Sequence, residues 1–401
     1  MYTISAVAEL YWDPYDEDIE VNPYETWRRM RDEAPVYRNE KHDFYALTRF
    51  ADVEAAHRDP QTFSSARGTV LELMGPDLSR TGQMIFLDPP EHTSLRQLVS
   101  RAFTPRRVVQ AEDRARELCA RMLEPLQGAS EFDYLADFGD HLPSLVISSL
   151  LGLPEEDQKA VRRIIDGIFH IEPGVGIVND TSINAGYEVS KYVDAELQKR
   201  RTEPRDDLLT ALVEAEIVDD SGEVRRMTPE ETVEFAMLLF VAGTETVGRF
   251  LGWAAVVLAE HPDQRKELAE DFSLIPKAVE ELLRYEAPSG IQGRWTTRDV
   301  ELHDTLIPEP SKVLLLTGAA GRDERVYPDA DRFDIHRSGQ PHVSFGYGVH
   351  FCLGAALARL EGRVALEETL KRFPTWEVDH GRAVRLHTST VRGYSKVPII
   401  V

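Results

Sequence analysis

The chain has 401 residues and a formal net charge of −23, with 42% hydrophobic and 29% charged residues. That composition is typical of a globular protein, and the negative charge argues against nucleic-acid binding because such a surface repels phosphate backbones. Two cysteines exclude a disulfide framework and fit a reducing compartment.

The N-terminal segment has no basic region and no apolar stretch, and acids occur early, at Glu9, Asp13 and Asp16. It therefore predicts no signal peptide. No uncharged apolar run approaches the roughly 18 residues that a membrane span needs. We expect a cytoplasmic protein that does not associate with membranes.

The elements are predicted mainly as helices. A helix at 24–34, a hairpin at 35–50 and a helix at 51–59 precede a long connection at 60–86. Further helices are predicted at 91–102, 105–127, 141–152, 155–169, 185–202, 205–216, 262–271 and 276–286. The stretch 172–186 interrupts them, 218–227 predicts a turn or small hairpin, and strand patterns occupy 293–317 and 383–400. This pattern predicts a mainly α fold with small peripheral β-sheets, and one domain over residues 1–401.

The longest predicted helix spans 227–262. Thr228 suits the N-cap, Pro229 suits the first turn, and Glu231 completes a capping box. His261 followed by proline ends the helix. Its middle, FAMLLFVAG, is apolar on every side and should be buried all round.

Two interpretations of the next residues remain open. In the first, Glu245 pairs with Arg249 and Thr246 bonds back to the Ala242 carbonyl. In the second, Ala242 and Gly243 leave space for a ligand against the backbone, and Glu245 and Thr246 handle protons beside it.

The two cysteines differ in their surroundings. Cys119 lies in a helical pattern of apolar residues and is interpreted as a small buried hydrophobe. Cys352 lies among Gly346, Gly348 and Gly354, just before a helix whose N-terminus should lower the pKa of the thiol. The glycines allow close approach to the sulfur or to a flat ligand.

The surroundings of Cys352 argue against several sites. No second cysteine stands at a zinc-site spacing, and His350 occupies a position where a nucleophile elbow needs glycine. A third glycine for a dinucleotide loop and a Cys-x-x-Cys-His motif are both missing. A Cys-His nucleophile remains open, while a thiolate ligand of a non-covalently bound haem fits every feature.

The segment SFGYGVHFCLG resembles the ligand signature of the cytochrome P450 superfamily of haem-thiolate monooxygenases, complete here as Phe345, Gly346, Gly348, His350, Cys352 and Gly354. The resemblance covers the chain from about Pro23 to its end. It implies haem b, held without a covalent bond and ligated by the Cys352 thiolate.

Other motifs follow in that family's order. The resemblance implies cofactor contacts from His92, Arg96, Arg294 and His350, and a structural trio of Glu281, Arg284 and Arg337. It also assigns Ala242, Gly243, Glu245 and Thr246 to the oxygen-activation motif, with Glu245 and Thr246 as the catalytic acid and alcohol.

The implied reaction inserts one oxygen atom of O₂ into a small molecule, with electrons from a separate ferredoxin and an NAD(P)H-dependent reductase. Rival interpretations are a peroxide-driven enzyme or an isomerase or dehydratase on this fold, and a non-catalytic haem-binding protein. The acid–alcohol pair favours the monooxygenase.

The resemblance also implies where substrate and redox partner bind. The pocket should draw on 64–86, 170–186, 288–293, the central helix near Leu239 and the turn near Val391. Its expected apolar lining comprises Val70, Leu71, Leu73, Met74, Phe86, Phe169, Ile171, Ile177 and Ile291, with Arg67 and Arg80 as charged exceptions. We therefore expect a predominantly hydrophobic substrate. Five arginines are the expected dock for an acidic ferredoxin: Arg101, Arg106, Arg107, Arg359 and Arg363.

Overall fold

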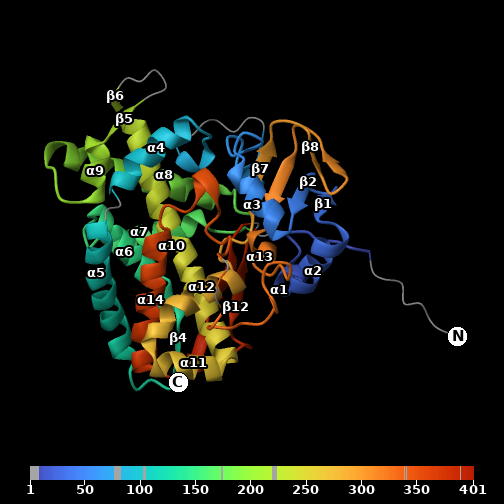
Figure 1. Ribbon diagram of the computed structural model, residues 1–401. Helices are drawn as coiled ribbons and strands as arrows, with labels where there is room; N and C mark the ends of the chain where they lie inside the picture. The colour runs from blue at the N-terminus through green and yellow to red at the C-terminus, as the bar shows by residue number, and fades with distance from the viewer. Residues whose placement is uncertain are drawn as a thin grey trace.

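A long central helix organises the computed structural model, which describes residues 9–75, 83–102, 105–172, 175–218, 224–337, 339, 341–388 and 390–401. This helix, α10 (Pro229–Glu260), runs through the middle of the molecule (Figure 1). Its predicted capping box is confirmed: the Glu231 amide donates to Thr228 Oγ1 at 3.1 Å, and the Thr228 amide donates to the Glu231 carboxylate at 2.8 Å.

Helices α6, α8 and α14 pack against α10. The helices are α1 (Glu17–Val21), α2 (Tyr24–Glu33), α3 (Phe50–Arg58), α4 (Glu91–Ala102), α5 (Pro105–Leu123), α6 (His141–Leu151), α7 (Gln158–Ile168), α8 (Asp180–Thr202), α9 (Leu208–Glu214), α11 (Pro262–Glu270), α12 (Ile275–Tyr285), α13 (Thr317–Ala320) and α14 (Ala355–Arg372). Short 3₁₀ turns are η1 (Leu71–Leu73), η2 (Met84–Phe86), η3 (Glu124–Leu126), η5 (Phe272–Leu274) and η6 (Gly348–His350), and η4 (Leu135–Gly139) is a π turn.

The largest difference from the predicted helices is the start of α8, five residues before the predicted boundary. Asn179 caps this helix: its side chain accepts from the Ser182 amide at 3.0 Å, and the Asn179 amide donates to Ser182 Oγ at 3.1 Å. This reciprocal pair satisfies amides of the first turn. Part of the predicted interruption at 172–186 is therefore helical.

Small sheets lie beside the helices, as predicted. The main sheet, at the right of Figure 1, has the strand order β1-β2-β10-β7-β3, antiparallel except where β10 runs parallel to β2. Its strands are β1 (Val36–Asn39), β2 (Phe44–Leu47), β3 (Phe63–Ser64), β7 (Gln292–Thr296) and β10 (Lys312–Leu315). A second sheet has the order β11-β14-β4, from β4 (Glu131–Asp133), β11 (Glu377–Val378) and β14 (Pro398–Ile400). Three hairpins pair β5 (Glu216–Val218) with β6 (Val224–Arg226), β8 (Val300–Leu302) with β9 (Thr305–Ile307), and β12 (Val384–His387) with β13 (Arg392–Lys396).

Within the described residues, α10 is the one helix long and apolar enough to cross a membrane. Its most apolar window is 61% buried inside the fold, by packing against the helices named above. We therefore interpret α10 as a core helix.

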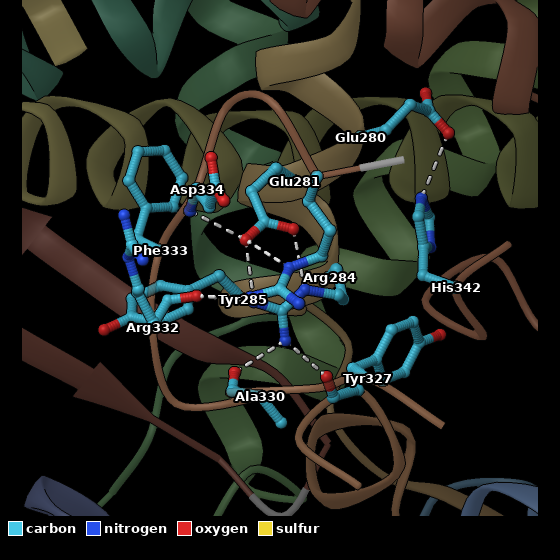
Figure 2. Close-up of polar contacts among 12 residues, drawn as sticks. Glu280, Glu281, Arg284, Tyr285, Tyr327, Ala330, Arg332, Phe333, Asp334 and His342 are labelled. Atoms are coloured by element: carbon cyan, nitrogen blue, oxygen red, sulfur yellow. Dashed lines mark hydrogen bonds and ion pairs between the residues drawn. The ribbon is translucent and has the colours of Figure 1, made fainter. Parts of the chain in front are cut away.

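A buried carboxylate on α12 connects this helix to the chain that follows it (Figure 2). Arg284 donates to both oxygens of Glu281, at 2.7 and 2.8 Å, and Arg337 donates to Glu281 Oε1 at 3.1 Å. The Asp334 amide donates to the same oxygen at 3.0 Å. Glu281 and Arg284 are 4% and 2% exposed, so this ion pair has almost no contact with solvent.

The two arginines also hold backbone carbonyls. Arg284 Nη1 donates to the carbonyls of Gly321 and Ala330, at 2.7 and 2.8 Å. Arg337 donates to the carbonyls of Pro328, Asp329 and Arg332 at 2.6 to 3.0 Å. The predicted trio therefore fixes the irregular segment 321–337 against α12.

Removing one partner should leave the other charged groups buried without their ion-pair and hydrogen-bond partner. We expect Glu281→Gln and Arg284→Ala to lower the free energy of unfolding by about 3–5 kcal/mol, measured by urea denaturation. The exposed pair of Arg382 with Glu131 is the matched control, and Arg382→Ala should leave the midpoint nearly unchanged. Equal midpoints for all three variants would contradict a structural role for the trio.

Candidate functional site

A cavity of about 340 Å³ lies beside the middle of α10. Its walls include α10, the loop that precedes α14, the end of α3, β7 and the segment around η2. Ten of the predicted site residues line it: Arg96, Ala242, Gly243, Thr246, Arg294, Phe345, Gly346, His350, Cys352 and Gly354. The structure thus brings together groups that lie as much as 258 positions apart, from Arg96 to Gly354.

The loop that carries Cys352 is held by its own backbone and by glycines. The Cys352 amide donates to the Phe345 carbonyl at 2.9 Å. Gly346 and Gly348 have φ values of +68° and +66°, which side chains disfavour. A Cβ on Gly348 would lie 2.5 Å from the His57 carbonyl oxygen, so this loop packs directly on the last turn of α3.

The helix start lowers the pKa of the Cys352 thiol as predicted, through the Gly354 amide, but the net pKa of the thiol in the protein alone is raised. Burial raises this pKa and outweighs the Gly354 amide and the charges of Arg96 and Arg359, which act in the opposite direction. Those three groups still favour a thiolate, and a bound cation is what would complete its stabilisation.

Positive and neutral donors gather at one end of the cavity. His92 is 1% exposed, and its ring packs on that of His350 with centroids 4.2 Å apart. Arg96 and Arg294 lie in the same region, where burial lowers the pKa of both guanidinium groups, to about 10 for Arg294. Burial and neighbouring cations lower the pKa of His92 to about 4 and of His350 to about 2, so both rings are neutral.

Ring nitrogens of the two histidines lack protein acceptors. Among the described residues, both ring nitrogens of His92 and Nε2 of His350 are buried without a hydrogen-bond partner. A buried donor without a partner carries a desolvation penalty of about 1–3 kcal/mol. The arrangement therefore suits a ligand that presents anionic oxygens here and an electrophilic metal at Cys352.

The α10 wall presents Thr246 to the cavity. Its hydroxyl donates back to the Ala242 carbonyl over a long 3.3 Å, whereas Thr244, which does not line the cavity, makes the equivalent bond to Phe240 at 2.8 Å. The weaker bond leaves Thr246 available to other partners. Gly243 also lines the cavity, and a Cβ there would lie 3.0 Å from Ile147 Cγ1, a tight contact between α10 and α6.

Glu245 points away from the cavity. Arg249 holds its carboxylate, with Nε and Nη2 at 2.7 and 2.6 Å from Oε1. Arg249 also donates to the Tyr394 carbonyl and lies 3.9 Å from Asp140. Burial raises the pKa of Glu245 although Arg249 opposes the shift. The first interpretation of this segment, the Glu245–Arg249 pair and the Thr246 back-bond, is therefore present, and so is the exposure of Ala242, Gly243 and Thr246 to a ligand space.

The rest of the cavity is mainly apolar, but its lining differs from the predicted set. Val70, Leu239 and Ala242 line it as expected, and the expected segments also contribute Met84, Ile85, Leu238, Pro288, Ser289, Gln292 and Thr390. Ile147 and Phe235 were not anticipated. Leu71, Met74 and Ile291 instead fill a core cluster with Trp12 and Trp27. The described lining contains no residue from 170–186, where Asn179 caps α8.

The structure also shows where some of the charged exceptions and expected docking arginines lie. Arg67 is exposed, with its guanidinium over the Trp295 ring, 5.7 Å from the centroid, and Arg80 lies outside the described residues. The side chains of Arg101, Arg106 and Arg107 also lie outside the described part of the chain. Arg359 pairs with Glu280 at 2.6 Å and Arg363 with Glu112 at 2.7 Å, so internal acids already balance these two charges.

Two ionisable residues of the cavity were also not anticipated. Glu361 on α14 is 1% exposed, and burial raises its pKa to about 8. His57, in the last turn of α3, is 4% exposed. The local pattern EAAHRD resembles any amphipathic helix end, so only the tertiary fold identifies His57 as a cavity residue.

Comparison with known proteins supports this picture. Residues 178–398 match the family model described as cytochrome P450. A putative cytochrome P450 123 from Mycobacterium tuberculosis is 41% identical over 98% of this chain and 97% of its own, and a vitamin D(3) 25-hydroxylase from Pseudonocardia autotrophica is 38% identical over 94% and 93%. The solved structure of cytochrome P450 CYP109Q5 from Chondromyces apiculatus aligns with a TM-score of 0.88 and 35% identity, over 97% of each chain.

The contact between the cysteine loop and α3 gives a test of the site's framework. Gly348→Ala should lower the free energy of unfolding by about 1–3 kcal/mol from backbone strain alone, with the contact to the His57 carbonyl adding to the loss. The control is Gly186→Ala in α8, where an added Cβ meets nothing within 4 Å, and this change should stabilise the helix by about 0.5–1 kcal/mol. Thermal unfolding of both variants measures the difference. Similar shifts in the same direction would refute the proposed loop geometry.

Proposed function

Because the chain belongs to the cytochrome P450 family, whose members are monooxygenases, we propose that it inserts one oxygen atom of O₂ into a predominantly hydrophobic small molecule. A separate ferredoxin with an NAD(P)H-dependent reductase supplies the electrons. The observation that carries this proposal is the position of Cys352, on the wall of an apolar cavity that Thr246 also lines.

The cofactor is the family's haem-thiolate, and we propose haem b held without a covalent bond. The cavity fits it: Cys352 offers the thiolate, the glycine loop permits close approach, and buried donors await the porphyrin carboxylates. His92, Arg96, Arg294 and His350 would bind those carboxylates, and Phe345 would pack beside the sulfur. When bound, the haem supplies oxygen activation at its iron.

The residues of α10 would manage protons. Thr246, with its weak back-bond, would hold a water in the cavity, and Glu245 would bring protons from the opposite face of the helix. Glu245 must then leave Arg249 for part of the cycle, since their ion pair points away from the cavity. Burial favours its neutral form, which weakens that pair once the acid is protonated.

The proposed substrate class follows from the lining. Phe235, Leu238, Leu239, Ile85 and Val70 contribute apolar surface, and burying such surface stabilises a complex by about 25 cal/mol per Å². Hydroxylation of vitamin D(3) by a relative is consistent with that class. We also propose that the chain forms one domain, acts in the cytoplasm, and binds neither membranes nor nucleic acids.

The first functional test concerns the thiolate. The ferrous carbon monoxide complex should show the strongly red-shifted Soret band of thiolate ligation, and Cys352→Ala should lose it. Cys119→Ala is the control and should keep the band, because Cys119 is fully buried among apolar residues. Loss of the band in Cys119→Ala but not in Cys352→Ala would disprove the assignment.

The second concerns proton delivery. With surrogate ferredoxin and reductase and a ligand found by its spin-state shift, Thr246→Ala should still consume NAD(P)H but release hydrogen peroxide, and product per NAD(P)H should fall about tenfold or more. Glu245→Gln should slow turnover. Thr244→Ala removes the neighbouring hydroxyl, which does not line the cavity, and should leave coupling unchanged. Unchanged coupling in Thr246→Ala would remove the proposed role.

The third concerns substrate charge. A carboxylic acid and its methyl ester, titrated by spin-state shift, should bind with comparable affinity, or the ester should bind more tightly. Arg67→Ala should change neither value, because its guanidinium lies on Trp295 and does not line the cavity. Binding of the acid alone, abolished by Arg67→Ala, would show that the pocket selects an anion.

A further inference from the structure

One histidine near the cysteine loop has no role in the function proposed so far. His57 lies in the last turn of α3, lines the cavity and is 4% exposed. Both of its ring nitrogens are buried and have no hydrogen-bond partner among the described residues. A histidine with a purely packing role would place at least one nitrogen against a neighbouring carbonyl, as His261 does against Val257 at 2.8 Å.

The cysteine loop lies against both the backbone and the ring of His57. A Cβ on Gly348 would lie 2.5 Å from the His57 carbonyl oxygen, and a Cβ on Gly346 would lie 3.6 Å from His57 Cε1. The imidazole therefore lies against the start of the loop that carries Cys352. This loop and α3 leave the ring edge facing the cavity that both of them line.

His57 also belongs electrostatically to the cationic end of the cavity. After burial, the charge of Arg294 is the second cause that lowers its pKa, to about 3, and His57 in turn contributes to the lowered pKa of His350. The ring is therefore neutral in the protein alone, and it carries one N–H donor. A ligand oxygen that accepts a hydrogen bond from Arg294 would therefore lie near the His57 ring.

We infer that His57 donates a ring N–H to a carboxylate of the bound porphyrin, alongside Arg294, as a third histidine of the carboxylate-binding group. The inference rests on the proposed haem cofactor. It explains why a polar ring, rather than an apolar side chain, occupies a buried position on the end of α3. It also means that α3 is joined to the cofactor and not only to the cysteine loop.

The test uses holoenzyme in which His57 is replaced by Phe, which keeps a ring but no donor, or by Gln, which keeps a donor. His57→Phe should release haem to apomyoglobin about tenfold faster than the unmodified protein, because a hydrogen bond to a charged group is lost. His57→Gln should recover much of that loss. The porphyrin carboxylate bending mode in the resonance Raman spectrum should shift in His57→Phe. His336→Phe is the matched control on the surface, where His336 pairs with Glu267, and should change neither reading.

The outcomes separate this inference from the proposed function. Unmodified protein without a thiolate-type Soret band would overturn the haem proposal itself. With that band present, an unchanged bending mode in His57→Phe would overturn the assignment of His57 alone. Equally fast haem loss in the Phe and Gln variants, with the bending mode unmoved, would show that the ring only fills space.

Discussion

The fold depends on one buried carboxylate, that of Glu281, finding hydrogen-bond donors for its oxygens. Glu281 accepts from Arg284, Arg337 and the Asp334 amide, and the two arginines spend their remaining donors on carbonyls between Gly321 and Arg332. An irregular segment cannot bury its carbonyls without such donors. The same helix reaches the cysteine loop through its neighbours, where Glu280 lies 3.2 Å from His342 (Figure 2). Ser344 Oγ also donates to the Leu283 carbonyl at 2.6 Å. α12 therefore fixes the chain on the way to Cys352.

The cavity gathers basic groups, whereas the chain as a whole is strongly acidic. A chain of net charge −23 concentrates Arg96, Arg294 and three neutral histidines at one end of an apolar space. Burial is the main reason why the rings stay neutral and why the pKa of Arg294 falls, and the charges of Arg96 and Arg294 further lower the pKa values of the histidines. Burying these groups without anionic partners costs free energy, and an anionic ligand removes that cost when it binds. The site is thus built for a partner that is apolar over most of its surface and anionic at one edge.

The sequence predicted what local chemistry determines. The capping box at Thr228 and Glu231 and the glycine loop at Cys352 each depend on residues close together in the chain, and each is confirmed. The prediction that the apolar centre of α10 is buried all round is wrong, because Leu238, Ala242 and Gly243 face the cavity and Ala242 is exposed. The sequence could not predict what depends on packing between distant segments. Ile147 and Phe235 line the cavity although they were not predicted to, and Leu71 and Met74 lie in a core cluster although they were predicted to line the cavity. Only the tertiary structure decides which apolar face meets the core. The early start of α8 depends on a reciprocal Asn–Ser cap. The nearby glycines made this start hard to predict from the sequence.

The two interpretations of the α10 segment are compatible with each other. Glu245 pairs with Arg249 and does not line the cavity, whereas the next residue, Thr246, does. The Glu245–Arg249 pair makes a buried acid tolerable on the far side, while the long Thr246 bond leaves a hydroxyl available on the near side. In the proposed proton delivery, protonation of Glu245 would weaken its ion pair with Arg249, because a neutral acid no longer attracts the guanidinium charge.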